Sequence, residues 1–348
     1  MTEATHVFGQ TPAPGEMLAP GARVGAWRVL RVLGRGGMGE VYLAERADRS
    51  FDKQVALKLV HGVLTPTARQ RFADEKQALA RLDHPHIARL IDAGENQFGW
   101  PYLVMEYVDG KPLDEALTGQ SLDAILPVFL QVCDALAYAH RQLVLHRDIK
   151  PSNILVDSEG RAKLLDFGVA KLLETADQAE ESRTVERAYT PDYASPEQVF
   201  GRPIGVASDV YSLGVLLYRL LTGQSPYRFD TSDTATLVQA LTDVQILPPS
   251  RAVLADAGAQ TSERRKRSRQ IAGDLDTVLS KALQKLPERR YPSVDAFADD
   301  LRRFLAHQPI HARPDAFWYR ARMFLRRNTL AVIAATAVLL AVLGGLAS

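Results

Sequence analysis

Residues 146–168 have the sequence HRDIKPSNILVDSEGRAKLLDFG, in which four polar side chains stand at the ends of short apolar runs. The four are Asp148, Lys150, Asn153 and Asp166. Turns that follow short buried segments present such side chains to a cleft, where binding residues concentrate. A polar hairpin without chemistry could explain either half of this stretch, but not both halves at this spacing. The stretch therefore predicts a site for a charged ligand.

The order H-R-D, K, N and then D-F-G resembles the catalytic and magnesium loops of bacterial, eukaryotic-like (Hanks-type) serine/threonine protein kinases. The resemblance extends over residues 27–306. It implies an α+β, bilobal protein kinase fold, with a β-rich N-lobe that carries helix C (27–107) and a mainly helical C-lobe (108–306). It also implies transfer of the γ-phosphoryl group of ATP to Ser/Thr hydroxyls of protein substrates, with activation by autophosphorylation.

The resemblance assigns a role to each polar residue of the stretch. Asp148 would orient the substrate hydroxyl and accept its proton, and Lys150 would neutralise the transferring phosphoryl group. Asn153 and Asp166 would bind Mg²⁺, with Mn²⁺ as an alternative, and Gly168 would let the magnesium loop turn. Lys150 and Thr190 favour Ser/Thr over Tyr acceptors within the family.

Composition narrows the class of protein without identifying it. The chain has 348 residues, 46% of them hydrophobic, which suffices for two lobes, and its formal net charge of +1 gives no argument for a nucleic-acid partner. Cys133 is the single cysteine, so an intramolecular disulfide is excluded, and we expect it to be a small buried residue rather than a reactive thiol.

A glycine-rich segment precedes the catalytic stretch and lies between two alternating strand patterns. This strand–turn–strand layout differs from the dinucleotide fingerprint, in which glycines join a strand to a helix. A flexible hairpin remains the alternative, but the layout resembles the kinase glycine-rich loop, whose amide groups approach phosphates. The residues expected to contact ATP here are Leu33, Gly34, Arg35, Gly36, Gly37, Met38, Gly39, Glu40 and Val41.

Lys58 lies on a strand at residues 55–60 and shares a face with Ala56, so both are expected at the nucleotide. A lysine here could instead extend to solvent. Thr65 and Pro66 predict the start of a helix that places Glu75 on its inward stripe. We expect Glu75 to pair with Lys58, as in active kinases; a surface charge is the alternative.

Residues 102–108 form a buried strand pattern that resembles the hinge between kinase lobes. Met105 would border the adenine pocket, and backbone groups of Glu106 and Val108 would bind the purine edge. The histidines His84 and His86 are expected to be structural rather than metal ligands.

Helical patterns dominate the second half of the chain, including a core helix with Ile125 and Phe129 and an apolar helix at 210–221 that ends at Gly223. By resemblance, Asp209 would hold the catalytic-loop backbone. The insert at 248–273 carries five basic residues and is interpreted as a solvated loop, with a contact to anionic lipid or a partner as the alternative. The five are Arg264, Arg265, Lys266, Arg267 and Arg269.

The polar segment before Ser195-Pro196-Glu197 resembles an activation loop. Ser182 and Thr184, eight and six residues before Thr190, are the expected autophosphorylation sites. Arg147 would bind the phosphate on that loop. Glu197 is expected to form a structural ion pair with Arg290.

An apolar run at 329–347 is uncharged and close to the roughly 20 residues that cross a bilayer. A basic juxtamembrane segment at 307–328, with Arg320, Arg322, Arg326 and Arg327, precedes it and predicts a cytoplasmic kinase domain. We therefore expect a single-pass inner-membrane protein; a buried soluble helix is the alternative. Residues 1–26 are expected to be a disordered leader.

Two other function classes are alternatives to a protein kinase. A pseudokinase scaffold that binds nucleotide and signals by interaction usually lacks Lys58, Asp148 or Asp166, and all three are present. A small-molecule phosphotransferase lacks a long activation segment. A homodimer that autophosphorylates in trans fits the family, although no interface is recognisable in the sequence.

Overall fold

The computed structural model describes residues 18–36, 39–50, 52–60, 65–167, 191–227, 241, 245–255 and 262–313. The chain forms two compact units. Unit 1 comprises Met1–Ala116 and Ala135–Thr190, and unit 2 comprises Leu117–Asp134 and Pro191–Ser348. The boundary between the units falls inside a long helix, α3 (Leu122–Arg141).

Unit 1 is built on an antiparallel sheet with the strand order β1-β2-β3-β4-β6-β5. Its core covers one face and is centred on Trp27, Tyr42 and Trp100. On β4, Val55, Leu57 and Leu59 point into this core, while Ala56 and Lys58 lie half-buried on the opposite face, as the strand parity predicts. The strands are β1 (Arg23–Val24), β2 (Trp27–Gly36), β3 (Gly39–Arg46), β4 (Val55–Val60), β5 (Leu90–Glu95) and β6 (Pro101–Glu106).

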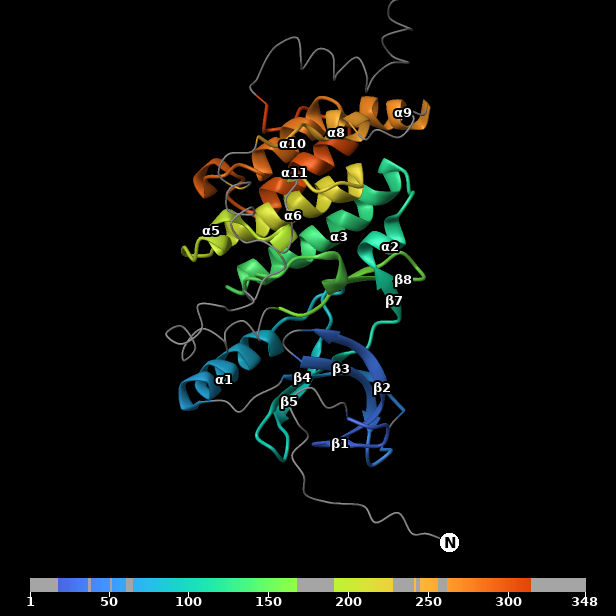
Figure 1. Cartoon of the computed structure of the whole chain (residues 1–348), viewed down its shortest axis with the longest axis vertical. Coiled ribbons are helices and arrows are strands. Elements are labelled where there is room, and N and C mark those ends of the chain that lie inside the picture. Colours follow the sequence, from blue (N-terminus) through green and yellow to red (C-terminus); the bar gives the residue numbers. More distant parts are fainter. Residues whose placement is uncertain are drawn as a thin grey trace, which may run out of the picture. The chain divides into compact units, whose positions relative to one another are not determined.

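The single long helix described next to this sheet, α1 (Pro66–Ala80), starts where the sequence predicts (Figure 1). The Thr65 hydroxyl accepts a hydrogen bond from the Ala68 amide, and Pro66 occupies the first helical position, where its missing N–H costs nothing. Phe72 and Leu79 are the buried residues of its apolar stripe. This stripe sets the direction in which Glu75 points.

The catalytic stretch lies in unit 1, and the predicted boundary between an N-lobe and a C-lobe at residue 108 stays a prediction. Backbone hydrogen bonds hold the stretch in this unit: the Ala88 amide donates to the Leu164 carbonyl, and the Leu164 amide donates to the His86 carbonyl, each at 2.9 Å. Leu164 lies in β9 (Ala162–Leu164), part of a small sheet with β7 (Gly110–Pro112) and β8 (Ile154–Asp157). The 3-10 turn Pro151–Asn153 leads into β8.

Two predicted boundaries differ from the structure. Residues 18–26 were assigned to a disordered leader, but β1 pairs with β2 and Val24 is 1% exposed, because its side chain completes the sheet core. At the other end, residues 307–313 pack on unit 2 beyond the expected boundary at 306. Ile310 is buried, and the Asp300 carboxylate accepts hydrogen bonds from the amides of His311 and Ala312.

Unit 2 is helical, and its centre is α6 (Val206–Thr222), which is buried on nearly all sides. This helix lies against α8, α10 and α11 (Figure 1). Gly223 ends it with a φ of 71°, as expected for a C-terminal glycine. Helix α2 (Leu113–Leu117) lies at the boundary between the two units in the sequence. The other elements of unit 2 are the 3-10 turn Pro191–Tyr193, α5 (Pro196–Val199), α8 (Pro249–Ala255), α9 (Ser262–Ile271), α10 (Asp274–Ala282), the 3-10 turn Pro287–Arg289 and α11 (Val294–Leu305).

The insert at 248–273 is therefore not the loop that the sequence analysis favoured, since it contributes α8 and α9. The sequence offered no strong apolar period there, and the helices are instead stabilised by packing against each other and on α6. The core helix prediction is confirmed: Ile125 and Phe129 on α3 are at most 1% exposed, and Cys133 on the same helix is fully buried.

Within the described part of the chain, α3 is the one helix long and apolar enough to cross a membrane, and more than half of its most apolar window is buried in the protein. A core helix of this kind passes the same test of length and composition. The predicted span at 329–347 lies outside the described residues.

The predicted ion pair between Glu197 and Arg290 is confirmed inside unit 2. Two guanidinium nitrogens donate to the two carboxylate oxygens at 2.7 and 2.9 Å, and both side chains are almost completely buried. Burial alone would raise the pKa of Glu197, but hydrogen bonds from Arg290 and from the Ser208 hydroxyl hold that pKa below its usual range. The pair fixes the start of α5 to the segment before α11.

We expect the Glu197→Ala variant to lower the free energy of unfolding by about 3 kcal/mol, because the substitution leaves Arg290 charged and buried without its carboxylate. Urea denaturation at pH 7 would measure this. Asp134→Ala, which removes an exposed ion pair with Arg302, should cost less than about 1 kcal/mol.

The sign of the pH dependence follows from the lowered pKa of Glu197. The ion pair stabilises the fold above the unfolded pKa of about 4.3 and loses this effect as the pH falls through the folded pKa. The difference between the wild type and Glu197→Ala should therefore shrink below about pH 4. A difference that is unchanged between pH 7 and pH 3 would contradict this account.

Leu143 ends α3 in the left-handed conformation, with a φ of 62° and 94% exposure. The Val144 amide donates to the Ala139 carbonyl and the Leu143 amide to the His140 carbonyl, both at 3.0 Å. This is the Schellman pattern, in which glycine is the preferred residue at the position of Leu143. The leucine is strained there and gains little from packing.

We expect Leu143→Gly to raise the free energy of unfolding by about 0.5–1 kcal/mol, because relief of the left-handed strain exceeds the entropy cost of a glycine. Thermal denaturation would show a higher midpoint. Leu286→Gly is the control, since Leu286 is also exposed but has a φ of −87°. Equal effects of the two substitutions would mean that backbone strain at Leu143 is not the cause.

Candidate active site

Asp148 is the centre of the polar cluster. Its carboxylate contacts the Lys150 ammonium and accepts a hydrogen bond from the side-chain amide of Asn153. Its Oδ2 atom lies 2.9 Å from Lys150 Nζ and 3.1 Å from Asn153 Nδ2. Asn153 Nδ2 also donates to the Asp148 carbonyl at 2.8 Å. The three residues that the sequence analysis singled out therefore meet at one carboxylate.

His146 positions this loop, a role that the sequence analysis did not assign to it. The ring is fully buried, its Nδ1 accepts from the Asp148 amide at 3.3 Å, and its Nε2 lies 2.9 Å from the Leu165 carbonyl. Because Nδ1 accepts, Nε2 carries the proton and donates to that carbonyl. The Phe167 ring lies 4.9 Å from the His146 ring. A histidine directly after the apolar run 143–145 was the signal available in the sequence.

Two residues of the cluster have left-handed backbones. The φ angles are 66° for Arg147 and 55° for Asp166, which are unfavourable for side chains other than glycine. Such strain is concentrated at functional sites, where the surrounding hydrogen bonds impose it. Here it directs Asp166 away from β9 and toward β4.

Lys58 reaches Asp166 across the site. Its Nζ atom lies 2.5 Å from Asp166 Oδ2, and the two side chains are 14% and 24% exposed. Lys58 therefore points inward, as predicted, and not to solvent.

The expected pairing of Lys58 with Glu75 is wrong in this structure. Glu75 is half-buried on α1, and Lys58 has Asp166 as its partner instead. Burial raises the pKa of the Glu75 carboxyl, and the nearby charge of Arg147 partly offsets this rise. Arg147, which was expected to bind a phosphate, thus faces a carboxylate here. From the sequence alone, either Lys58 or Arg147 could have been the cation near Glu75.

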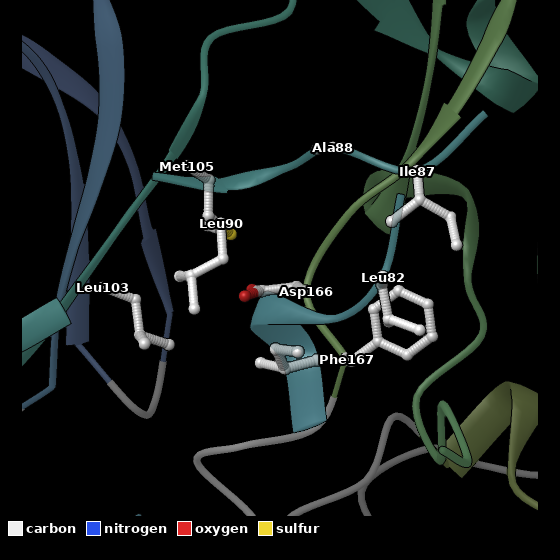
Figure 2. Close-up of a pocket in the computed structure, with 9 residues that line it drawn as sticks. Leu82, Ile87, Ala88, Leu90, Leu103, Met105, Asp166 and Phe167 are labelled. Atoms are coloured by element: carbon white, nitrogen blue, oxygen red, sulfur yellow. The ribbon is translucent and has the colours of Figure 1, made fainter. Parts of the chain in front are cut away.

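A small cavity of about 20 Å³ adjoins this cluster. Figure 2 shows the Asp166 carboxylate pointing into it, with Met105 and Leu90 on one side and Leu82 and Phe167 on the other. Met105 lines this cavity, and its place at the back of an adenine pocket stays a prediction. The cavity is apolar except for Asp166.

The glycine-rich segment has the predicted strand–turn–strand layout, since β2 and β3 pair from Trp27↔Arg46 to Gly36↔Gly39. Gly39 is required by the fold: its φ is 141°, and a Cβ atom there would lie 1.9 Å from the Leu59 carbonyl oxygen. Gly34 and Gly36 have ordinary φ angles and nothing within 4 Å of an added Cβ. Neither packing nor backbone geometry explains these two glycines, whereas close approach of a ligand does.

The hinge contains an ion pair that the sequence analysis missed. The Glu106 carboxylate accepts from Lys163 Nζ, 3.0 Å from each oxygen, and the Glu106 amide donates to the Arg89 carbonyl at 2.9 Å. A purine contact at Glu106 would therefore use its carbonyl oxygen. Lys163 lies on β9 three residues before Asp166, so it connects the hinge to the magnesium loop.

The cluster fits a hard divalent cation. Asn153 directs its Nδ2 atom to Asp148, which makes its carbonyl oxygen the candidate ligand, and Asp166 supplies a carboxylate. Oxygen donors of these two types are the ones that Mg²⁺ prefers. The lysines 58 and 150 add positive charge for phosphate groups.

The structure gives the positions of several other predicted residues, and their roles stay predictions. Asp209 is 1% exposed in the first turn of α6, and its link to the catalytic loop stays a prediction. Leu33, Arg35, Glu40 and Val41 lie on β2 and β3, and Val108 follows β6. The remaining predicted residues lie outside the described part of the chain: Gly37, Met38, Gly168, Ser182, Thr184 and Thr190.

The histidines after α1 make structural contacts, as expected. His86 Nδ1 lies 2.9 Å from the Ala162 carbonyl, and the His84 ring stacks on Tyr138 with the ring centres 5.2 Å apart. The first contact joins the segment after α1 to the catalytic stretch, and the second joins it to α3.

Comparison with known proteins agrees with this arrangement. Residues 27–301 match the protein kinase domain family. The serine/threonine-protein kinase Pkn1 of Myxococcus xanthus is 38% identical over 301 residues, which cover 84% of this chain and 40% of that protein. The serine/threonine-protein kinase PknB of Mycobacterium leprae is 35% identical over 292 residues, covering 81% and 43%. The chain thus spans about two fifths of the length of these relatives.

Among solved structures, the kinase domain of Mycobacterium tuberculosis PknI matches with a TM-score of 0.62 and 29% identity, covering 83% of this chain and 99% of that one. The fold is accordingly that of the bilobal protein kinases, with a β-rich N-terminal sheet and a helical lobe. On its sequence, its fold and the cluster at Asp148, the chain belongs to the protein kinase domain family, in the bacterial serine/threonine branch.

Proposed function

We propose that the chain is an ATP-dependent serine/threonine protein kinase. The observation that carries this proposal is the meeting of Lys150 and Asn153 at the Asp148 carboxylate, beside the Lys58–Asp166 pair. A pseudokinase scaffold would not need this complete set of polar side chains, and no feature of the described residues favours a pseudokinase.

Asp148 accepts the proton of a substrate hydroxyl in this proposal. The hydrogen bonds to Oδ2 orient its carboxylate, and general base catalysis of this type contributes about 10²–10⁴-fold to a rate. Lys150 balances negative charge on the transferring phosphoryl group. Lys58 binds the phosphates of ATP, and the Glu106 carbonyl and Val108 amide bind the adenine edge.

Asn153 and Asp166 would hold a divalent cation, Mg²⁺ or Mn²⁺, which supplies positive charge to bridging phosphate oxygens when bound. Lys58 then exchanges part of its contact with Asp166 for the phosphates and for Glu75. The raised pKa of the Glu75 carboxyl supports this view, because a half-buried carboxylate gains stability when a cation approaches it.

Regulation is proposed to run through autophosphorylation at Ser182 and Thr184, with Arg147 as the phosphate-binding cation. The half-buried Arg147 beside Glu75 supports such a role, since a phosphate carries more charge than a carboxylate and competes for the guanidinium. Trans-autophosphorylation would need a homodimer, and the acceptors are Ser/Thr residues of proteins.

The membrane assignment is also a proposal. The apolar run at 329–347 anchors the chain in the inner membrane by one span, and the arginines between 320 and 327 keep the kinase domain cytoplasmic. The packed residues to Arg313 support a shorter juxtamembrane segment than 307–328, starting at about residue 314.

We expect Asp148→Asn to lower kcat by about 10³-fold while ATP binding is retained, because only the proton acceptor is lost. Labelling of a generic protein acceptor with radioactive ATP measures this, and Asp123→Asn, an exposed substitution on α3, is the matched control. Equal labelling by Asp148→Asn and wild type would remove the kinase proposal, and mapping of labelled peptides that finds Ser182 and Thr184 unmodified in active enzyme would remove the phosphosites.

Substitutions at two glycines should distinguish an effect on ligand binding from an effect on folding. Gly36→Ala should leave stability unchanged and raise the KM for ATP about tenfold, because its added methyl group meets only the space where a phosphate would lie. Gly39→Ala should instead lower the free energy of unfolding by more than about 1 kcal/mol, since its Cβ would collide with the Leu59 carbonyl. An unchanged KM in Gly36→Ala would show that the phosphates bind elsewhere.

A further inference from the structure

Helix α9 (Ser262–Ile271) has two faces of different character. Ser262, Arg265, Lys266 and Arg269 are exposed and follow the spacing i, i+3, i+4, i+7, which places them on one stripe. The stripe formed by Arg264, Arg267, Ser268 and Ile271 has the same spacing and is half-buried or buried. The basic residues of the insert are thus divided between a structural face and an outward cationic stripe of Arg265, Lys266 and Arg269.

The structural face sets the rotation of α9. The Arg267 guanidinium donates to the carbonyls of Leu221 at 2.9 Å, Leu220 at 3.2 Å and Gln120 at 2.8 Å, so it caps the last turn of α6. The Ser268 hydroxyl donates to the Ser250 carbonyl at 2.8 Å, and Ile271 is fully buried. Because these contacts involve rigid partners, the cationic stripe is held facing outward.

The end of the described part of unit 2 lies beside the segment that follows α9. Arg313, the last described residue, places its Nη1 atom 2.8 Å from Asp274 Oδ1, and Asp274 is three residues after Ile271. Asp300 fixes the preceding residues, since its carboxylate accepts from the His311 and Ala312 amides and from the Tyr291 hydroxyl. Residue 313, which precedes the segment leading to the apolar run in the sequence, is therefore anchored near the end of α9.

The length of chain between these points limits how far the stripe can be from the membrane. Residues 314–328 lie between Arg313 and the apolar run, and a fully extended chain of that length reaches at most about 55 Å. A helix of ten residues such as α9 is about 15 Å long. The stripe can accordingly reach the surface that the run enters.

We infer that the cationic stripe Arg265, Lys266 and Arg269 docks on the anionic lipid headgroups of the membrane that anchors the chain, and so holds unit 2 against the bilayer. This inference rests on the proposed membrane span. The chemistry favours lipid because three outward cations on one rigid stripe match a surface of phosphate charge. Each basic residue near such a surface raises partitioning about fivefold, so that three together contribute about a hundredfold.

The test uses the full chain in nanodiscs. Ser262→Cys places a thiol on the stripe, and a maleimide dye reacts there selectively because the one native cysteine, Cys133, is fully buried. Quenching of the dye by headgroup-labelled lipid reports the approach of α9 to the bilayer. We expect clear quenching in discs with about a third of anionic phosphatidylglycerol, weak quenching in pure phosphatidylcholine, and loss of the difference at about 1 M salt, where the Debye length is about 3 Å.

The deciding variant is R265E/K266E/R269E in the Ser262→Cys background, which should lower quenching in anionic discs to the level of neutral discs. R23E/K53E/R289E changes the net charge equally at exposed positions outside α9 and should retain the quenching. Circular dichroism checks that each variant is folded, and kinase activity in detergent should be unchanged.

The outcomes separate the two proposals. A chain that enters nanodiscs but shows equal quenching in anionic and neutral lipid would overturn the docking of α9 and leave the anchor intact. A chain that does not enter nanodiscs would overturn the anchor and, with it, this inference. Retained quenching in R265E/K266E/R269E would show that another surface approaches the bilayer.

Discussion

The ion pair between Lys58 and Asp166 is the interaction around which the site is built. It joins β4 to the loop after β9, two segments that are 108 residues apart in the sequence. A half-buried ammonium and carboxylate at 2.5 Å attract each other more strongly than an exposed pair does, and the residues that line the cavity beside them are apolar except for Asp166 itself. Without this pair, either charge would be left poorly compensated in an apolar environment.

The catalytic stretch can meet β4 because it is bound to the small sheet by its backbone. The bridge between Leu164 and the segment after α1, together with the His86 contact to Ala162, makes β9 an extension of unit 1. His146 then connects the Asp148 amide to the Leu165 carbonyl, so that Asp148 and the loop that carries Asp166 share one buried ring. The strained backbones of Arg147 and Asp166 are the cost of this connection.

Local patterns predicted those parts of the molecule in which a residue's neighbours along the chain decide its environment. Strand parity placed Lys58 opposite the core, Thr65 and Pro66 marked the start of α1, and Gly223 marked the end of α6. Patterns failed where long-range packing decides. The helices of the basic insert have no apolar period of their own, and Val24 becomes a core residue through its pairing with β2.

The sequence alone determined the family, the residue types of the site and the candidates for proton acceptor, cation ligands and phosphate-binding lysine, because these depend on which functional groups are present and on their spacing. Only the tertiary structure decided the partners. Lys58 contacts Asp166 rather than Glu75, Glu75 faces Arg147, and Arg267 turns inward while its neighbours on α9 face outward. The physical reason is that each of these charges has several opposite charges or carbonyls within reach, and the choice depends on distances and burial that arise only when distant segments pack together.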